Sequence, residues 1–153
     1  MRVQDLMSRQ TQSCRPDDTL ESAAQLMWSG DCGCLPVCAG NGSSRVSGMI
    51  TDRDICLSAL FQGKPLKELR VQSAMSKSVE TCRPSDSLAQ AEKLMRNARV
   101  RRLPVLDEHD SLVGMISLAD LAREATRELA KQRREITEAE VGDTLAAICH
   151  PPK

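Results

Sequence analysis

Aromatic residues are almost missing from this sequence, and their scarcity disfavours one class of function. Trp28 and Phe61 are the only two, and the 153 residues include no tyrosine. Aliphatic side chains and methionines must therefore fill the hydrophobic core. Proteins that bind single-stranded nucleic acids commonly stack the bases on aromatic rings, so we expect no such platform in this chain.

A net charge is also missing, since 21 basic residues balance 21 acidic ones. A neutral chain is a poor ligand for bulk nucleic acid or for an anionic membrane surface. No apolar run approaches the roughly 20 residues of a membrane span, and the amino terminus has no signal-peptide core. We therefore expect a soluble, cytoplasmic protein that binds no membrane, with nucleic acid disfavoured as a partner.

Catalytic groups are scarce as well. His109 falls in a predicted turn and His150 in the tail, and neither has an identifiable nucleophile or acid partner. No glycine-rich loop of the Walker or dinucleotide-binding kind is present. These absences predict that the protein is not an enzyme and has no catalytic residues.

Seven cysteines are present, an odd number without secretory features, which suits a reducing compartment. The spacing of Cys32, Cys34 and Cys38 does not match common zinc sites. If residues 34–38 are extended, the ends lie about 13 Å apart, too far to share one metal. We expect buried, apolar cysteines and no metal site. A regulatory disulfide between Cys14 and Cys38 is an alternative, because both fall near the ends of predicted strands.

An internal repeat is the most informative feature that is present. Residues 3–37 recur at 71–105, and residues 48–54 recur at 114–120, where Gly-Met-Ile-Thr is answered by Gly-Met-Ile-Ser. Each copy, at roughly 60 residues, is too small to bury a secure core alone. We therefore expect the copies to pack together, with the functional site where they meet.

Each copy is predicted to follow a β-α-β-β-α order. In the first copy we predict a helical turn at 3–7, a brief strand near 10–14 and a helix that is capped by Asp18 and ends at Gly30. Strands at 34–38 and 46–50 should follow, joined by a turn at 40–44. The copy should end with a helix from Thr51 to about Leu60. Apolar residues at helical spacing mark the buried faces, namely Leu20, Ala23, Ala24 and Met27 in the first copy and Leu88, Ala91 and Met95 in the second. The second copy should repeat these elements, with strands at 103–106 and 112–116 and a helix from Ser117.

The tail is predicted to be helical. The helix after Asp120 should continue to about Arg134 with a solvated, charged face. Thr137 and Glu140 predict a capping box for a last helix that ends near Cys149, before Pro151 and Pro152. The chain thus divides into copies at 1–62 and 68–125 and a helical tail at 126–153.

A hydroxyl and a carboxylate occur at the same strand-to-helix junction in both copies, as Thr51 with Asp54 and Ser117 with Asp120. A helix amino terminus favours a phosphate, and an ionised carboxylate can accept hydrogen bonds from ribose hydroxyls. The same spacing is also that of a capping box. Spacing alone leaves both interpretations open.

A cluster of positive charges distinguishes the second copy. It comprises Lys93, Arg96, Arg99, Arg101 and Arg102, with no acid between 93 and 102. Arg101 and Arg102 lead directly into a strand, and arginine suits bidentate phosphate binding. The equivalent residues of the first copy, Gly33 and Cys34, carry no charge. A solvated basic surface is the alternative, but the second copy is favoured for an anionic ligand.

These motifs together resemble the CBS domain, named after cystathionine β-synthase, in tandem. The matching segments are Asp-Leu-Met-Ser at 5–8, the proline-then-helix segment at 15–20, Leu-Pro-Val at 35–37 and Gly-Met-Ile-Thr-Asp-Arg-Asp at 48–54, each with a related second copy. The resemblance covers about residues 1–125. It implies an α+β fold of two repeats related by pseudo-twofold symmetry. It also implies a small stand-alone protein of the bacterial type that associates as a homodimer.

The resemblance also implies a ligand, because this family commonly senses AMP, ADP, ATP or S-adenosylmethionine in clefts between repeats. Asp54 and Asp120 would hold ribose, Thr51 and Ser117 would contact ribose or phosphate, and the arginines would neutralise phosphate. The full set of implied nucleotide-binding residues is Thr51, Asp54, Arg101, Arg102, Pro104, Val105, Ile116, Ser117 and Asp120, with the aliphatic ones sandwiching adenine. The alternative is a ligand-free scaffold or a redox-responsive interaction module that uses Cys14, Cys38 or the tail.

Overall fold

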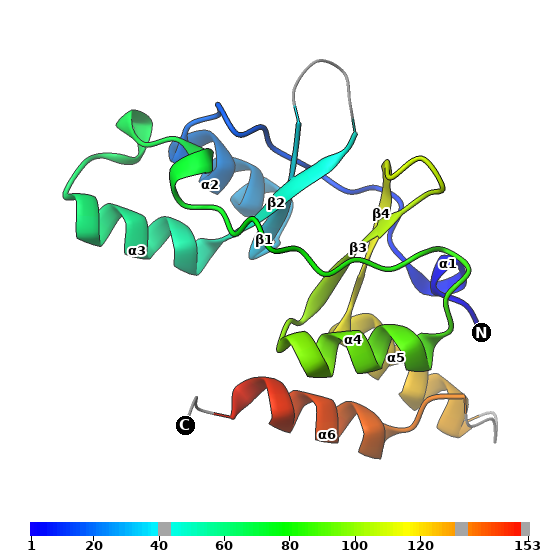
Figure 1. Ribbon diagram of the computed structural model, residues 1–153. Helices are drawn as coiled ribbons and strands as arrows, with labels where there is room; N and C mark the ends of the chain where they lie inside the picture. The colour runs from blue at the N-terminus through cyan, green and yellow to red at the C-terminus, as the bar shows by residue number, and fades with distance from the viewer. Residues whose placement is uncertain (40–43, 131–134, 151–153) are drawn as a thin grey trace. The chain divides into compact units, whose positions relative to one another are not determined.

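Each sequence copy forms two helices and a β-hairpin. The first copy contains helix α2 (Leu20–Ser29), strands β1 (Cys34–Cys38) and β2 (Val46–Thr51) and helix α3 (Asp52–Gln62). The second contains α4 (Leu88–Ala98), β3 (Arg102–Leu106), β4 (Leu112–Ser117) and α5 (Leu118–Ala130). Short helical segments α1 (Val3–Leu6), η1 (Leu66–Glu68) and η2 (Val71–Ser73) and the tail helix α6 (Glu138–Cys149) complete the chain (Figure 1). This computed structural model describes residues 1–39, 44–130 and 135–150.

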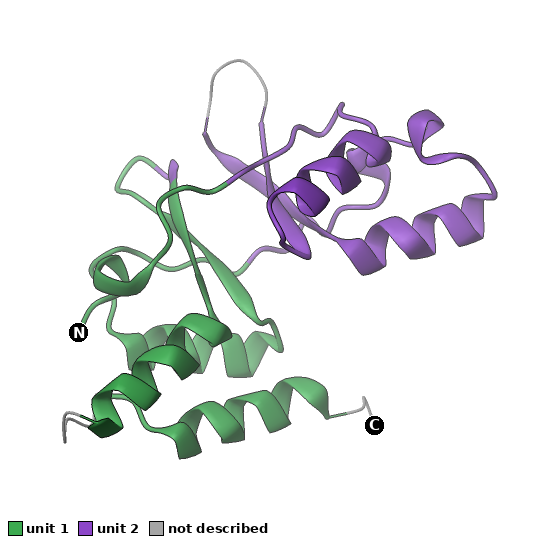
Figure 2. Cartoon of the chain, turned by 180° about the vertical axis from the view of Figure 1, so that it is seen from behind, with its two compact units in different colours: residues 1–11, 80–109, 113–153 green, residues 12–79, 110–112 purple. Residues whose placement is uncertain are grey.

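The chain folds as two compact units, and each unit combines parts of both sequence copies. Unit 1 comprises residues 1–11, 80–109 and 113–153, and unit 2 comprises residues 12–79 and 110–112 (Figure 2). Ser8, from the first copy, exchanges two backbone hydrogen bonds of 2.9 Å with Met115 of β4. Ser76, from the second copy, does the same with Met49 of β2. The opening segment of each copy therefore extends the hairpin of the other copy.

Glycine is required where each opening segment meets its hairpin. A Cβ atom on Gly114 would lie 2.7 Å from the Ser8 carbonyl oxygen, and one on Gly48 would lie 2.7 Å from the Ser76 carbonyl oxygen. A side chain at either position would clash with this backbone, so packing requires the glycine of the motif in both copies.

Each unit has its own aliphatic core. The residues of the unit 1 core with no exposed surface are Val3, Ala91, Met95, Leu103, Val105, Ile116 and Leu121, and those of unit 2 are Leu20, Ala23, Val37, Ile50 and Val71. Val3 and Val71 come from the exchanged opening segments. The predicted apolar faces of α2 and α4 are confirmed, and no aromatic side chain contributes to either cluster among the described residues.

Two local predictions for the first copy are wrong. The cap of α2 is Thr19, whose Oγ1 accepts a hydrogen bond from the Ser22 N–H at 3.1 Å, and Asp18 instead accepts from the Arg15 N–H at 2.7 Å. No strand forms at 10–14. Cys14 alone pairs there, donating its N–H to the Pro36 carbonyl at 3.1 Å and accepting from the Cys38 N–H at 2.9 Å. The turn just after Cys14 leads the chain away from the sheet.

The tail helix α6 forms with the predicted capping box. The Glu140 N–H donates to Thr137 Oγ1 at 3.2 Å, and the Glu140 carboxylate accepts from the Thr137 N–H at 2.8 Å. The expected solvated face of α5 is present at Arg123 and Arg127, which are exposed. It does not include Glu124 and Glu128, which are buried where α6 packs on α4 and α5. The predicted turn at 40–43, the helix end at 131–134 and the prolines at 151–152 lie outside the described residues. No described helix is both long and apolar enough to cross a bilayer.

Candidate anion-binding site

Both strand-to-helix junctions are closed by capping boxes. At the first, Asp54 Oδ2 accepts hydrogen bonds from the Thr51 N–H at 2.9 Å and from Thr51 Oγ1 at 2.8 Å, while the Asp54 N–H donates to Thr51 Oγ1 at 3.1 Å. At the second, Asp120 Oδ2 accepts from the Ser117 N–H at 2.8 Å and from Ser117 Oγ at 2.6 Å. In the structure the motif therefore forms a capping box at both junctions.

The two junctions differ in the second oxygen of the carboxylate. Asp120 Oδ1 is paired with the guanidinium of Arg123, one turn along α5, whose side chain is 64% exposed. In the first copy Leu57 stands at the position of Arg123. Asp120 thus has an exposed, exchangeable partner that Asp54 lacks at that position.

Arg101, Arg102 and Ser117 line one cavity of about 390 Å³ in unit 1. The Leu118 N–H donates to the Arg101 carbonyl at 2.9 Å, which ties the start of α5 to the start of β3. The other residues that line the cavity are Leu118, Ala119 and Ala122 of α5 and Val141 and Leu145 of α6. The volume lies in the range of small-molecule pockets.

This cavity is positively charged. Arg101 and Arg102 contribute two guanidinium groups, and the amino terminus of α5 adds the partial positive charge of its helix dipole. None of the described residues that line it is acidic. An anion is the ligand that this combination favours, and arginine provides the planar donor geometry for a phosphate.

The equivalent place in unit 2 has the opposite charge. Gly33 stands at the position of Arg101, and Asp52 at that of Leu118. Both line the cavity of unit 2, and a Cβ atom on Gly33 would lie 3.0 Å from Asp52 Oδ2. A carboxylate at this point repels an anion, so the two copies do not have equivalent ligand preferences.

Other residues proposed from the sequence lie elsewhere. Pro104, Val105 and Ile116 are buried in unit 1, the last two with no exposed surface, and they do not line the 390 Å³ cavity. Arg96 binds Glu92 and Thr144, and Arg99 ends α4 in a left-handed conformation with φ of 55°. Arg101 and Arg102 are the members of the arginine cluster that line the cavity.

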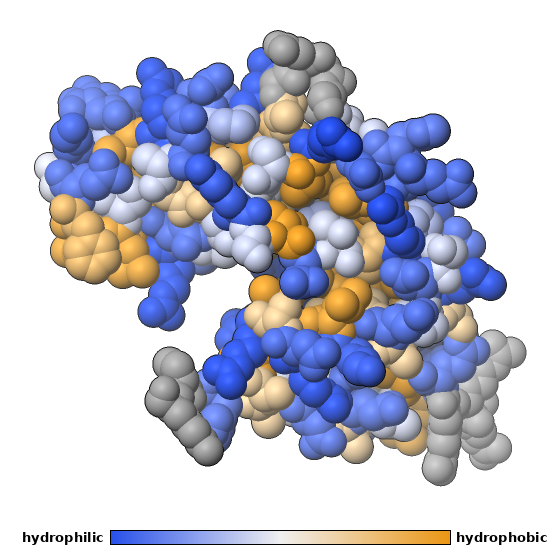
Figure 3. Space-filling view, viewed as in Figure 1, coloured by the Kyte–Doolittle hydropathy of each residue, from blue (hydrophilic) through white to orange (hydrophobic). Residues whose placement is uncertain are grey.

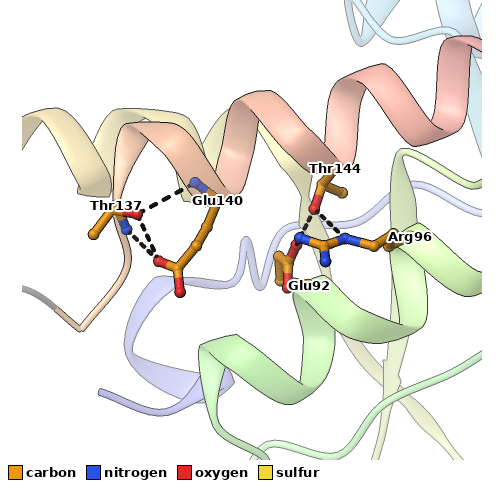
Figure 4. A network of polar contacts seen from close by, with 5 residues as sticks. All are labelled: Glu92, Arg96, Thr137, Glu140 and Thr144. Atoms are coloured by element: carbon orange, nitrogen blue, oxygen red, sulfur yellow. Dashed lines mark hydrogen bonds and ion pairs between the residues drawn. The ribbon is translucent and has the colours of Figure 1, made fainter.

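The contribution of α6 to this cavity was missed from the sequence. Val141, Leu145 and Ile148 follow an i, i+4, i+7 spacing, which was the available signal for a packed helix face. The anchor of this helix is Thr144, which is fully buried. Figure 4 shows its hydroxyl between Glu92 and Arg96 of α4. Its hydroxyl accepts from Arg96 Nε at 3.2 Å and donates to Glu92, and Arg96 also pairs with Glu92 at 2.6 Å.

The cysteines proposed as a redox pair are neighbours in unit 2. Cys14 and Cys38 are both buried and both free, and the backbones are joined by the 2.9 Å hydrogen bond from Cys38 N–H to Cys14 carbonyl. Burial raises the pKa of the Cys14 thiol to about 12 and also raises the pKa of Cys38. The disulfide stays a prediction. Within the described part of the chain, no three His, Cys, Asp or Glu side chains gather as a metal site.

Comparison with known proteins identifies the repeat. The family model described as "CBS domain" matches residues 3–59 and 67–127. The CBS domain-containing protein YhcV of Bacillus subtilis is 37% identical over 120 residues, covering 78% of this chain and 82% of that protein. Hypoxic response protein 1 of Mycobacterium tuberculosis is 30% identical over 149 residues, covering 97% of this chain and 94% of that protein.

Solved structures agree with this comparison. The crystal structure of Hypoxic Response Protein I with two coordinated zinc ions matches with a TM-score of 0.72 at 32% identity, covering 80% of this chain and 98% of that one. The CBS domain pair of protein MJ0100, in complex with 5′-methylthioadenosine and S-adenosyl-L-methionine, has the same fold, with a TM-score of 0.72 at 22% identity over 84% of this chain and 98% of that one.

Proposed function

The chain belongs to the CBS domain family as a tandem pair, a regulatory module, and from this premise we propose that it senses an adenosine-containing nucleotide such as AMP, ADP, ATP or S-adenosylmethionine. Domains of this family are generally regulatory rather than catalytic, so we propose no enzymatic reaction. We further propose that it acts in the cytoplasm as a homodimer.

One observation carries this proposal, namely that Arg101, Arg102 and Ser117 line a single cavity without an acidic residue among the described lining. A phosphate placed there would meet two guanidinium groups at the amino terminus of α5. For S-adenosylmethionine the carboxylate of the amino acid would take the same position. The first copy has Gly33 and Asp52 at the equivalent place and would not bind the anion.

The apolar walls suit the base of a nucleotide. Ala119 and Ala122 of α5 and Val141 and Leu145 of α6 offer aliphatic surface beside the arginines. In a chain with two aromatic residues, aliphatic contact is the available way to hold adenine. Pro104, Val105 and Ile116 would then act from the core, by holding β3 and β4 in place behind this surface.

We further propose that Asp120, which follows the lining residues Ser117, Leu118 and Ala119 but does not itself line the cavity, recognises the ribose at its edge. Its Oδ2 atom belongs to the capping box, but its Oδ1 atom faces Arg123, which is largely exposed. A ribose could take the place of this guanidinium, because the ionised carboxylate accepts hydrogen bonds from vicinal hydroxyls. Thr51 and Asp54 would have the capping role alone. The adenosine ligands of the MJ0100 pair support this class of ligand.

Isothermal titration of the full-length protein with AMP, ATP and S-adenosylmethionine tests the proposal. We expect saturable heat for at least one ligand, and a loss of affinity of at least about tenfold in Arg101→Ala and in Arg102→Ala, since one charge-assisted contact contributes on the order of 1.5–3 kcal/mol. Asp120→Asn should weaken binding, whereas Asp54→Asn and Arg53→Ala, in the first copy, should not. Absence of heat with all three ligands at millimolar concentration would refute the sensor, and unchanged affinity in the arginine variants would refute the site.

A further inference from the structure

The tail helix α6 forms part of the wall of the anion-binding cavity in unit 1. Val141 and Leu145 of α6 line this cavity together with Arg101 and Arg102. The last residue of α6 also reaches one of these arginines, because Arg101 Nη2 donates a hydrogen bond to Cys149 Sγ at 3.6 Å. The helix therefore contacts both the apolar and the charged side of the cavity. The first sequence copy is followed by a short link and not by a tail, so only the copy with the two arginines has such a helix.

Little of α6 is buried by its packing on unit 1. Of the residues Glu138–Cys149, Thr144 is the one that is buried, whereas four residues of α4 and five of α5 are buried. Val141 and Ile148 are partly buried against the core of unit 1. A helix that buries little apolar surface opens at a lower free-energy cost than a core helix does. We therefore expect α6 to open locally while α4 and α5 stay folded.

The surfaces that meet where α6 docks are polar and mainly acidic. Glu92, Glu124 and Glu128 are buried where α6 packs on α4 and α5. Arg96 and Arg127 pair with the first two, and α6 itself has three acidic residues and no basic one. Like charges weaken the docking of α6, and water can hydrate these groups when the helix leaves. Figure 3 shows mainly hydrophilic side chains over α4 and α6, which agrees with a surface that tolerates water.

One oxygen atom at the approach to α6 is shielded from water and has no hydrogen bond in exchange. The Glu128 carboxylate accepts through Oε2 from the N–H groups of Glu135 and Ile136. Its Oε1 atom is buried and has no hydrogen-bond partner among the described residues. A buried oxygen without a partner raises the free energy of the docked state, and hydration on opening would recover part of this cost. The docked position is thus only moderately favoured, and a ligand with different affinities for the two positions can shift the equilibrium.

We infer that α6 exchanges between a docked and an open position, and that a nucleotide in the cavity stabilises the docked one. Val141 and Leu145 can contact the base only when α6 is docked, so the nucleotide binds this state more tightly and shifts the equilibrium toward it. The coupling is reciprocal, so weaker docking of α6 weakens nucleotide binding. The inference rests on the proposed function and specifies how occupation of the same site is coupled to a movement of the chain.

Hydrogen exchange of the full-length protein, followed by mass spectrometry of peptides, tests the movement. Without ligand, peptides of α6 should exchange faster than peptides of α5, whose Leu121 is fully buried. A saturating concentration of AMP or ATP should slow exchange in α6 at least about fivefold, the lower end of typical coupling between sites. Exchange in α2 and α3 of unit 2 should not change. In Arg101→Ala the same concentration should slow exchange in α6 less, because less nucleotide is bound.

Two substitutions to valine on α6 test the reciprocal effect. Thr144→Val removes the buried anchor hydroxyl, whereas Ala146→Val places the same side chain on the exposed face of the helix. Neither residue belongs to the described residues that line the cavity. In isothermal titration, Thr144→Val should raise the nucleotide dissociation constant at least about fivefold, and Ala146→Val should leave it unchanged. Circular dichroism checks that both variants are folded.

A nucleotide that binds the wild type without slowing exchange in α6 would overturn the inference and leave the sensor standing. Unchanged affinity in Thr144→Val would do the same, as would an α6 that is as protected as α5 in the absence of ligand. Absence of nucleotide binding to the wild type would refute both proposals. If Thr144→Val did not fold, the exchange data on the wild type would decide between these outcomes by themselves.

Discussion

Cys14 and Cys82 occupy equivalent positions in the two copies and have the same surroundings. Each thiol lies 3.9 Å from a carbonyl oxygen of the neighbouring strand, that of Pro36 or of Pro104. Burial raises the pKa of both thiols to about 12. A buried thiol with a raised pKa is a weak nucleophile at neutral pH, and both thiols pack in the hydrophobic cores.

The raised pKa values predict how stability depends on pH. In the unfolded chain the thiols ionise near 9.0, but in the folded protein they stay neutral up to about 12. Their contribution to stability is therefore complete below about pH 9 and is lost as the pH rises from about 9 toward 12. Urea midpoints measured across this range should fall for the wild type and fall less steeply for the Cys14→Ala, Cys82→Ala double variant. Equal slopes would contradict the prediction.

At the scale of single elements, the tail helix α6 is held by buried polar contacts. Thr144 binds Glu92 and Arg96, as described above. At the approach to α6, the buried carboxylate of Glu128 accepts hydrogen bonds from the N–H groups of Glu135 at 2.8 Å and Ile136 at 2.9 Å. These contacts fix α6 where its side chains complete the wall of the Arg101 cavity.

Thr144→Val tests this anchor, because valine keeps the shape and removes the hydroxyl. We expect the free energy of unfolding to fall by about 1–3 kcal/mol, since Glu92 and Arg96 lose a buried partner. Thr126→Val removes a surface hydroxyl that binds Glu138 and should change stability by less than about 0.5 kcal/mol. Urea denaturation of both variants gives the comparison. If the two changes were equal, the buried contact would not be the anchor.

Most elements could be predicted from the sequence because their signals are local. Apolar spacing located α2 and α4, and the Thr137–Glu140 capping box located α6. The cap of α2 was misassigned to Asp18, because Asp18 and Thr19 are both good capping residues. Asp18 instead accepts a hydrogen bond within the preceding turn, which leaves Thr19 as the cap. The strand expected at 10–14 failed because pairing requires a partner strand, and only Cys14 has one.

At the scale of the whole molecule, the opening segments are exchanged between the copies. Val3 belongs to the first copy but lies in the core of unit 1, and Val71 belongs to the second but lies in the core of unit 2. Both are fully buried. Each core therefore needs a segment of the other copy, and neither sequence copy contains a complete core.

Val3→Ala and Val71→Ala form a matched pair that tests the exchange. Each substitution should cost about 2 kcal/mol, from the lost methyl groups and the cavity left behind. Hydrogen exchange, followed by mass spectrometry of peptides, should show Val3→Ala increasing exchange in β3 and β4 and Val71→Ala increasing it in β1 and β2. Increased exchange of β1 and β2 in Val3→Ala alone would mean that each copy folds on its own segments.

By itself the sequence determined the repeat, the family, the α+β class and the charge difference between Arg101 and Gly33, because these follow from residue identity and short-range spacing. Only the tertiary structure decided that the opening segments change places, that Val105 and Ile116 lie in the core and that α6 covers one face while leaving its counterpart bare. These features depend on contacts between residues that are distant along the chain. Different segments compete for the same buried surface, and residue identity and short-range spacing do not show which segment occupies it.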